Sequence, residues 1–277
     1  MINNENNLSK YEEVTFHTQI YGGGIPVVML HGFVLDHRVM KGSIEPLLIG
    51  KKFKRIYFDL PGMGLTKRSE KINNADEMIE AIVWHIKSLV GESKFLLMGM
   101  SYGGYLARGV MDQLKDQVLG MFLFVPVVKP LGHLRRLPMH QVLKVEVLFF
   151  ESLSKEEQEA LMANNVIISA ENYVREKAEI LDAVEIADHE YLEKYQSEGY
   201  EASYDVDRDA TLFEGPVTLL AGKQDSVVGY EDQYELSLKY KRSTYAAIDV
   251  AGHGLQIDQP ELFNAFVNNW ISIFETE

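Results

Sequence analysis

The chain has no cysteine among its 277 residues. Disulfide bonds, a catalytic thiolate and cysteine-ligated metal sites are therefore excluded. Basic residues are also scarce, with 27 Lys and Arg against 41 Asp and Glu and a net charge of −14. Such a surface repels the phosphates of nucleic acids, so we expect a small-molecule substrate and no nucleic-acid partner.

Long hydrophobic runs are absent too. The longest strongly apolar stretch, MFLFVPVV at 121–128, is far too short to span a membrane. The first residues, MINNENNLSKYEEV, are polar and lack the apolar core of a secretory signal. We therefore expect a cytoplasmic protein that makes no membrane contact, and the sequence carries no signal of its oligomeric state.

Short apolar runs recur along the chain and alternate with helical patterns. Between 75 and 90 one apolar stripe predicts a helix, which leaves His85 off the stripe and facing solvent. Residues 14–20 alternate, with Val14, Phe16 and Ile20 on one face, as in a half-buried strand. The pattern predicts an α/β fold with a mostly parallel sheet and helices on both faces. The predicted buried strands are 26–30, 56–58, 95–98, 121–125, 217–221 and 245–248.

One region interrupts this alternation. Residues 127–207 contain no convincing buried strand and are rich in helical patterns. We therefore expect a core made of residues 1–126 and 208–277, with a helical insertion at 127–207. The helices predicted in the insertion are 139–151, 154–164, 169–186 and 188–197.

A serine is bracketed by glycines at the end of one predicted strand. Residues 99–103 read GMSYG, and a helical pattern follows from Tyr102 to Leu114. The sequence G-x-S-x-G between a strand and a helix is typical of a nucleophile elbow, a sharp turn that needs small residues on both sides of the serine. Ser101 is therefore the candidate nucleophile.

A serine nucleophile needs a general base, and the base needs an acid that orients it. His253 lies in AGHG, after the last predicted strand and before the final helix. Asp225 follows the strand 217–221 and precedes His253, as the order Ser, Asp, His requires. We predict Ser101, His253 and Asp225 as a catalytic triad. No His or carboxylate cluster has metal-ligand spacing, so we expect no metal and no other cofactor.

These pieces together resemble the α/β-hydrolase fold superfamily. The matching segments are HGF at 31–33, DLPGMGLT at 59–66, GMSYGG at 99–104, GKQD at 222–225 and GHGLQIDQPE at 252–261. The resemblance implies that the backbone N–H groups of Phe33 and Tyr102 form the oxyanion hole. It also places His31 close to the substrate, and it makes the insertion at 127–207 a cap.

The resemblance leaves the reaction open. A serine hydrolase that cleaves a small or medium carboxylic ester is favoured, with an iminopeptidase-like aminopeptidase or a carbon–carbon bond hydrolase as alternatives on the same triad. A ligand-binding receptor with little or no turnover is an alternative of another class. In the stretch KPLGHLRR at 129–136, Arg135 and Arg136 either recognise an anionic substrate group or belong to a solvated loop. Cap carboxylates such as Glu201, Asp205 and Asp207 either hold a substrate amine or form a surface charge run.

Overall fold

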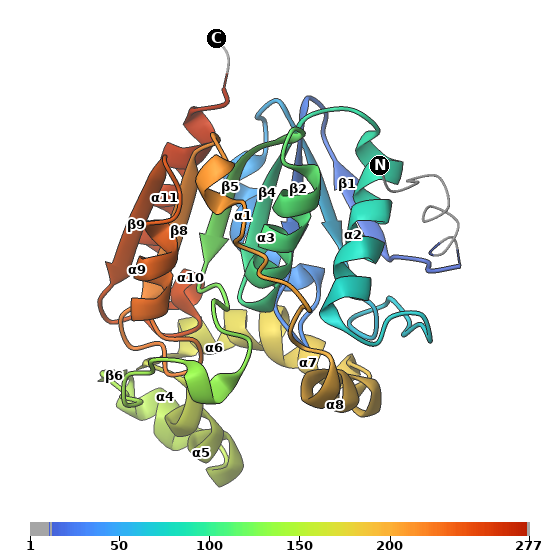
Figure 1. Ribbon diagram of the computed structural model, residues 1–277. Coiled ribbons are helices and arrows are strands. Elements are labelled where there is room, and N and C mark those ends of the chain that lie inside the picture. The colour runs from blue at the N-terminus through green and yellow to red at the C-terminus, as the bar shows by residue number, and fades with distance from the viewer. Residues whose placement is uncertain (1–10, 12, 276–277) are drawn as a thin grey trace.

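The computed structural model describes residue 11 and residues 13–275, and its centre is a seven-stranded sheet (Figure 1). The strand order is β1-β3-β2-β4-β5-β8-β9, in which β1 is antiparallel to β3 and every other pair is parallel. The predicted α/β fold with a mostly parallel sheet is confirmed. The strands are β1 (Thr18–Tyr21), β2 (Ile25–Leu30), β3 (Phe53–Phe58), β4 (Phe95–Met100), β5 (Val118–Phe124), β8 (Val217–Gly222) and β9 (Ser243–Ile248).

The central strands are buried because helices cover both faces of the sheet. Every residue of β4 and β8 is buried, which explains their uninterrupted apolar sequences. Helices α2 and α3 contact each other on the face turned toward the viewer in Figure 1, while α1 and α11 contact each other on the opposite face. The helices of the core are α1 (His37–Leu48), α2 (Ala75–Val90), α3 (Tyr102–Leu114), α9 (Glu231–Ser237), α10 (Leu255–Asp258) and α11 (Pro260–Ser272).

The segment between β5 and β8 forms a helical layer beyond the carboxyl ends of the strands (Figure 1). A wide turn of π-helix at Lys177–Leu181 joins α6 to α7, so the predicted helix 169–186 is nearly continuous. A short parallel pair, β6 with β7, links the start of the layer to its middle. Its elements are β6 (Lys144–Val145), α4 (Val147–Ser152), α5 (Lys155–Asn164), β7 (Ile167–Ile168), α6 (Ala170–Glu176), α7 (Asp182–Ile186) and α8 (His189–Glu198).

Four local predictions were wrong. Strand β9 is not buried, as 245–248 was expected to be, because it lies at the edge of the sheet and Ile248 alone of its residues is buried. Residues 139–146 are not helical and include the short strand β6, because the N–H groups of Leu143, Lys144 and Glu146 donate to the carbonyls of Val166 and Ile168. Ile20 is 43% exposed and does not share a buried face with Val14 and Phe16. The strand β1 begins only at Thr18, so the predicted alternation from residue 14 to residue 20 does not form one strand. His85 is buried rather than solvent-facing.

His85 is buried because the segment before β1 covers it. Its ring stacks on Phe16 at a centroid distance of 4.2 Å, and its Nε2 lies 2.9 Å from the Thr18 hydroxyl. Burial lowers the pKa of His85 to about 4, so the ring is neutral near pH 7. No helix in the described residues is long and apolar enough to cross a membrane.

Candidate active site

Ser101 lies in a sharp turn between β4 and α3. Its backbone has φ 52° and ψ −120°, a conformation that L-residues rarely adopt. A Cβ on Gly99 would lie 2.6 Å from the Gly103 carbonyl oxygen, and one on Gly103 would collide with the carbonyls of Leu30 and His31. The two glycines are therefore required because the strand and the helix pack against each other at this turn.

The structure brings Ser101, His253 and Asp225 together from three different loops. The distance from Ser101 Oγ to His253 Nε2 is 2.9 Å, and that from His253 Nδ1 to Asp225 Oδ2 is also 2.9 Å. Asp225 is completely buried, whereas the His253 side chain is 23% exposed. Since a carboxylate can only accept, Asp225 fixes the proton of His253 on Nδ1 and leaves Nε2 free to accept the Ser101 proton.

The second oxygen of Asp225 is held by the backbone. Its Oδ1 accepts hydrogen bonds from the N–H groups of Val227 at 2.9 Å and Val228 at 3.0 Å. These bonds fix the plane of the carboxylate and turn Oδ2 toward His253. The orientation of the acid is therefore set by the turn that follows β8.

Backbone strain gathers at the same edge of the sheet. Besides Ser101, the described non-glycine residues with positive φ are Val34, Val125 and Val250, with φ of 59°, 42° and 55°. Each follows the carboxyl end of a strand, and for a β-branched residue this conformation costs on the order of 1–3 kcal/mol. Strain of this kind is typical of functional sites that are held in one geometry by their surroundings.

The loop that carries Phe33 passes directly beside the serine. A Cβ on Gly32 would lie 3.3 Å from Ser101 Cβ, so the two segments are in close contact. Tyr102 is the first residue of α3, and its N–H therefore has no acceptor within the helix. Both expected oxyanion donors thus belong to segments that adjoin Ser101.

His31 is not placed to contact a substrate, contrary to the expectation from the resemblance. Its side chain is completely buried, Nδ1 lies 2.8 Å from the Gly32 carbonyl oxygen, and Nε2 accepts from the Leu60 N–H at 2.9 Å. Burial lowers the pKa of His31, which keeps the ring neutral. His31 therefore connects the loop that follows β2 to the loop that follows β3.

Arg135 and Arg136 are also engaged within the protein. Arg135 donates to the carbonyls of Lys129, Pro130 and Val227 at 2.8–3.0 Å. Arg136 Nε lies 2.6 Å from Asp232 Oδ1, and its Nη1 lies 2.7 Å from Glu235 Oε1 in α9. The basic stretch 129–136 therefore fastens the start of the helical layer to the core, and both guanidinium groups already bind groups of the protein itself.

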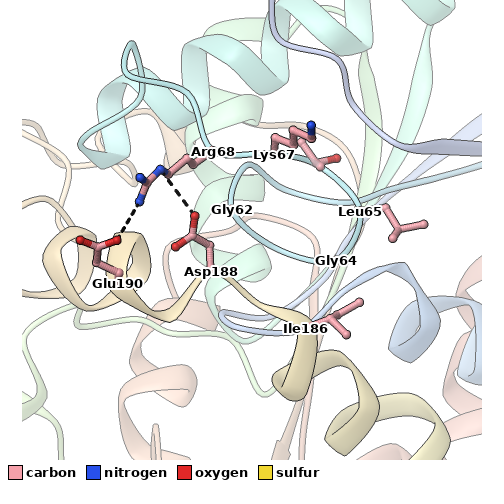
Figure 2. Close-up of a pocket in the computed structure, with 9 residues that line it drawn as sticks. Gly62, Gly64, Leu65, Lys67, Arg68, Ile186, Asp188 and Glu190 are labelled. Carbon is pink, nitrogen blue, oxygen red and sulfur yellow. Dashed lines mark hydrogen bonds and ion pairs between the residues drawn. The ribbon is translucent and has the colours of Figure 1, made fainter.

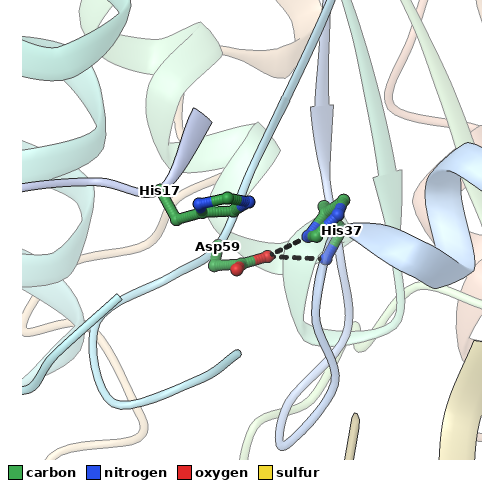
Figure 3. A group of neighbouring side chains, drawn as sticks. All are labelled: His17, His37 and Asp59. Atoms are coloured by element: carbon green, nitrogen blue, oxygen red, sulfur yellow. Dashed lines mark hydrogen bonds and ion pairs between the residues drawn. The ribbon is translucent and has the colours of Figure 1, made fainter. Parts of the chain in front are cut away.

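Among residue 11 and residues 13–275, one group of side chains could hold a metal ion, although the sequence spacing gave no sign of it. His17, His37 and Asp59 offer ligand atoms within 4.8 Å of one another (Figure 3). His37 Nδ1 lies 2.7 Å from Asp59, while the Gln19 amide lies 2.9 Å from His37 Nε2 and 3.3 Å from His17 Nε2. Lys41 fixes that amide by donating to its oxygen at 2.8 Å. A metal ion would have to displace the amide, so these contacts support a structural link between β1 and α1.

A cavity of about 470 Å³ lies between the loop that follows β3 and the helical layer (Figure 2). Arg68 spans it, 3.6 Å from Asp188 and 3.3 Å from Glu190. The Asp188 N–H also donates to the Gly62 carbonyl at 2.9 Å. No triad residue lines this cavity, whose lining is Gly62, Gly64, Leu65, Thr66, Lys67, Arg68, Ile186, Asp188 and Glu190.

Sequence reasoning assigned no role to Asp258, although the residue lay within the matched segment GHGLQIDQPE. Its carboxylate accepts from the Gly252 N–H at 2.9 Å, next to His253, and from the backbone of Ile167 in β7. Burial, aided by the nearby Glu176 carboxylate, raises the pKa of Asp258 to about 7, and the two hydrogen bonds oppose the rise. Asp258 therefore links the His253 loop to the helical layer.

Comparisons with known proteins agree with this architecture. A family model described as serine aminopeptidase, S33 matches residues 26–260. The AB hydrolase superfamily protein YisY of Bacillus subtilis is 20% identical over 92% of this chain and 95% of its own length. An α/β superfamily hydrolase from Oenococcus oeni superposes with a TM-score of 0.86 and 28% identity, covering 94% of this chain and 96% of its own.

A further relative matches only in part. The pimeloyl-[acyl-carrier protein] methyl ester esterase of Nitrosomonas europaea is 28% identical over 39% of this chain and 40% of its own length. The family model extends from β2 to the start of α11, so it includes every strand of the sheet except β1. The chain therefore belongs to the serine aminopeptidase S33 family of the α/β-hydrolase superfamily and is a hydrolase.

Proposed function

We propose that the protein hydrolyses a small or medium carboxylic ester through an acyl-enzyme on Ser101. The observation that carries this proposal is the unbroken chain of 2.9 Å contacts from Ser101 through His253 to Asp225. His253 Nε2 takes the proton of Ser101 Oγ as that oxygen attacks the ester carbonyl, and then gives it to the departing alcohol. Water, activated by His253 in turn, attacks the acyl group and releases the carboxylic acid.

The oxyanion of each tetrahedral intermediate is bound by the backbone N–H groups of Phe33 and Tyr102. The closeness of Gly32 to Ser101 and the position of Tyr102 at the first turn of α3 support this assignment. The N-terminus of α3 adds a partial positive charge where the negative charge develops. Loss of one such donor typically lowers kcat by about 100- to 1,000-fold.

The contacts of the acidic residues favour an ester over a substrate with a free amine. An aminopeptidase needs an unpaired carboxylate to hold the substrate ammonium. Asp207 instead pairs with the buried Arg108 at 2.7 Å, and Asp205 accepts from the Asp207 N–H at 2.9 Å. Glu201 is exposed, and with Asp205 it lines a cavity that includes none of Ser101, Asp225 and His253, so neither carboxylate faces the nucleophile there. The partly matched relative is named as an ester hydrolase, which points the same way.

The helical layer acts as a cap that determines specificity, and 127–207 are our proposed limits for it. It lies over the carboxyl ends of the strands, where the triad loops meet (Figure 1). Its contacts reach two of those loops, through Arg135 to Val227 and through Ile167 to Asp258. The cap is therefore joined to the loop of the acid and to the loop of the base.

A substrate panel tests the proposed reaction. Wild type and Ser101→Ala are assayed with p-nitrophenyl acetate, butyrate and octanoate, with alanine and proline p-nitroanilides, and with a vinylogous β-diketone. We expect turnover of the short esters by wild type only. Faster turnover of an anilide or of the diketone would replace the ester with an aminopeptidase or a carbon–carbon bond hydrolase. Binding without turnover of any substrate would favour a receptor.

A further inference from the structure

The two residues assigned to the oxyanion hole carry aromatic side chains that meet the same pair of cap tyrosines. The Phe33 ring lies 6.1 Å from that of Tyr195 and 5.1 Å from that of Tyr200, between centroids. The Tyr102 ring stacks on Tyr200 at 4.0 Å and lies 6.2 Å from Tyr195. Phe33 and Tyr102 also touch each other edge to face at 5.6 Å. The cap therefore contacts both segments from which the oxyanion donors project.

A directed chain of hydrogen bonds runs through this cluster. The Tyr102 hydroxyl donates to the Tyr200 carbonyl at 3.1 Å, so the Tyr195 hydroxyl donates to Tyr102 at 2.8 Å. Tyr102 is completely buried, and Tyr195 is 2% exposed. Burial raises the pKa of both hydroxyls well above the usual range, so neither loses its proton at neutral pH. Water does not compete for these bonds, which fix the ring of Tyr102 relative to the cap.

The backbone of Tyr102 is held on its other side by the core. Gly103 packs against the carbonyls of Leu30 and His31 without room for a side chain. The peptide that carries the Tyr102 N–H thus lies between a rigid strand end and a side chain anchored to the cap.

We propose that Tyr195 is a positioning residue for the oxyanion hole. Its hydroxyl holds Tyr102 and thereby aims the Tyr102 N–H at the developing oxyanion. The inference rests on the proposed acyl-enzyme function and adds a residue of the cap to it. It also makes the rate of the chemical step depend on the position of α8.

The same helix offers a matched control. Tyr191, one turn before Tyr195, donates its hydroxyl to the Ile72 carbonyl at 2.6 Å. Its ring lies 6.0 Å from that of Tyr195, but its hydroxyl binds the core at a carbonyl that does not belong to the Tyr102 cluster. Tyr191→Phe and Tyr195→Phe each remove one hydroxyl from α8 and keep the ring. A residue that only packs the cap changes the melting temperature in both variants alike, and kcat in neither.

The experiment measures kcat, KM, melting temperature and the affinity for an alkyl trifluoromethyl ketone, which forms a tetrahedral oxyanion adduct with a serine. The proteins are wild type, Tyr195→Phe, Tyr191→Phe, Tyr102→Phe and the double variant Tyr102→Phe with Tyr195→Phe. For Tyr195→Phe we expect kcat and ketone affinity to fall together by about 10-fold, because small misplacements of a catalytic group cost this much or more. We expect KM to stay within about twofold and Tyr191→Phe to retain a wild-type kcat.

The double variant separates coupling from independent losses. We expect it to be no slower than Tyr102→Phe alone, because Tyr195 acts through that hydroxyl. Equal kcat values for Tyr195→Phe and Tyr191→Phe, or a change in KM without a change in ketone affinity, would overturn the inference. Labelling of Ser101 by a fluorophosphonate in the same samples keeps the two proposals apart. Stoichiometric labelling of wild type supports the acyl-enzyme function whatever Tyr195 does, whereas an inert wild type removes the function and the inference with it.

Discussion

The exchange of Asp225 for asparagine tests the role of the acid with little change in shape. The asparagine side chain would keep an oxygen for the N–H groups of Val227 and Val228, but it would turn an NH₂ group toward His253. His253 would then accept at Nδ1 and carry its proton on Nε2, where it cannot take the proton of Ser101. The contacts therefore predict a catalytic defect in a folded protein.

The expected loss of kcat follows from the wrong tautomer of His253. At such triads this exchange lowers kcat by about 10⁴-fold, which corresponds to about 5.5 kcal/mol of transition-state stabilisation. The melting temperature of Asp225→Asn should stay close to that of wild type because both backbone hydrogen bonds are retained. Asp225→Ala also loses the acceptor of the buried Val228 N–H, so it should lose roughly 1–3 kcal/mol of stability.

The assay is p-nitrophenyl butyrate hydrolysis under saturating substrate, with thermal unfolding followed by circular dichroism on the same samples. The alanine variant serves as the control for loss of structure. If Asp225→Asn keeps more than a tenth of the wild-type kcat, then the carboxylate does not set the tautomer of His253, and the assignment of Asp225 fails.

Two further predictions concern side-chain contacts between the core and the cap. A raised pKa means that folded Asp258 binds its proton up to about pH 7, whereas the unfolded carboxyl loses it near pH 4. The stabilisation that protonated Asp258 gives is thus complete below pH 4 and declines toward pH 7, by up to about 1.4 kcal/mol per pH unit. In urea unfolding, the free energy of unfolding of Asp258→Asn should lack this decline. If the free energies of wild type and variant change with pH in parallel, the prediction is contradicted. Arg108, fully buried, pairs with Asp207 at 2.7 Å and donates to the Val127 carbonyl at 2.8 Å, so Arg108→Met should cost about 3–5 kcal/mol. The double variant with Asp207→Leu should recover most of that loss, and a stability equal to the single variant would refute the argument.

Local pattern was enough to predict the central buried strands and the turn at Ser101, whereas the local patterns at 14–20 and 139–146 gave wrong predictions. The apolar runs of β4 and β8 predicted buried strands because both faces of these strands are covered by helices. The sequence GMSYG predicted a strand-to-helix turn at Ser101, and the structure has that turn, in which packing leaves no room for side chains at Gly99 and Gly103. The positions of Asp225 and His253 after two predicted strands also indicated that they lie close together, because the carboxyl ends of parallel strands meet at the same edge of the sheet.

The remaining features depend on contacts between distant parts of the chain. Arg136 looked like a free cation in an acidic protein, yet its partner Asp232 is 96 residues away. His85 does not lie on the apolar stripe of its helix, so the sequence predicted an exposed side chain. It is buried because Phe16 and Thr18, nearly 70 residues earlier in the chain, cover it. Tyr195 carries no local signal at all, because its partner Tyr102 lies 93 residues earlier, in the core.

The central claim is that Ser101 is a nucleophile activated by His253, and intact-mass analysis after treatment with a small fluorophosphonate tests it most directly. Wild type, Ser101→Ala and His253→Ala are labelled under identical conditions after circular dichroism has established that each is folded. We expect one adduct on wild type, none on Ser101→Ala and a much slower reaction of His253→Ala. An adduct on Ser101→Ala, or equal labelling rates for wild type and His253→Ala, would contradict the account.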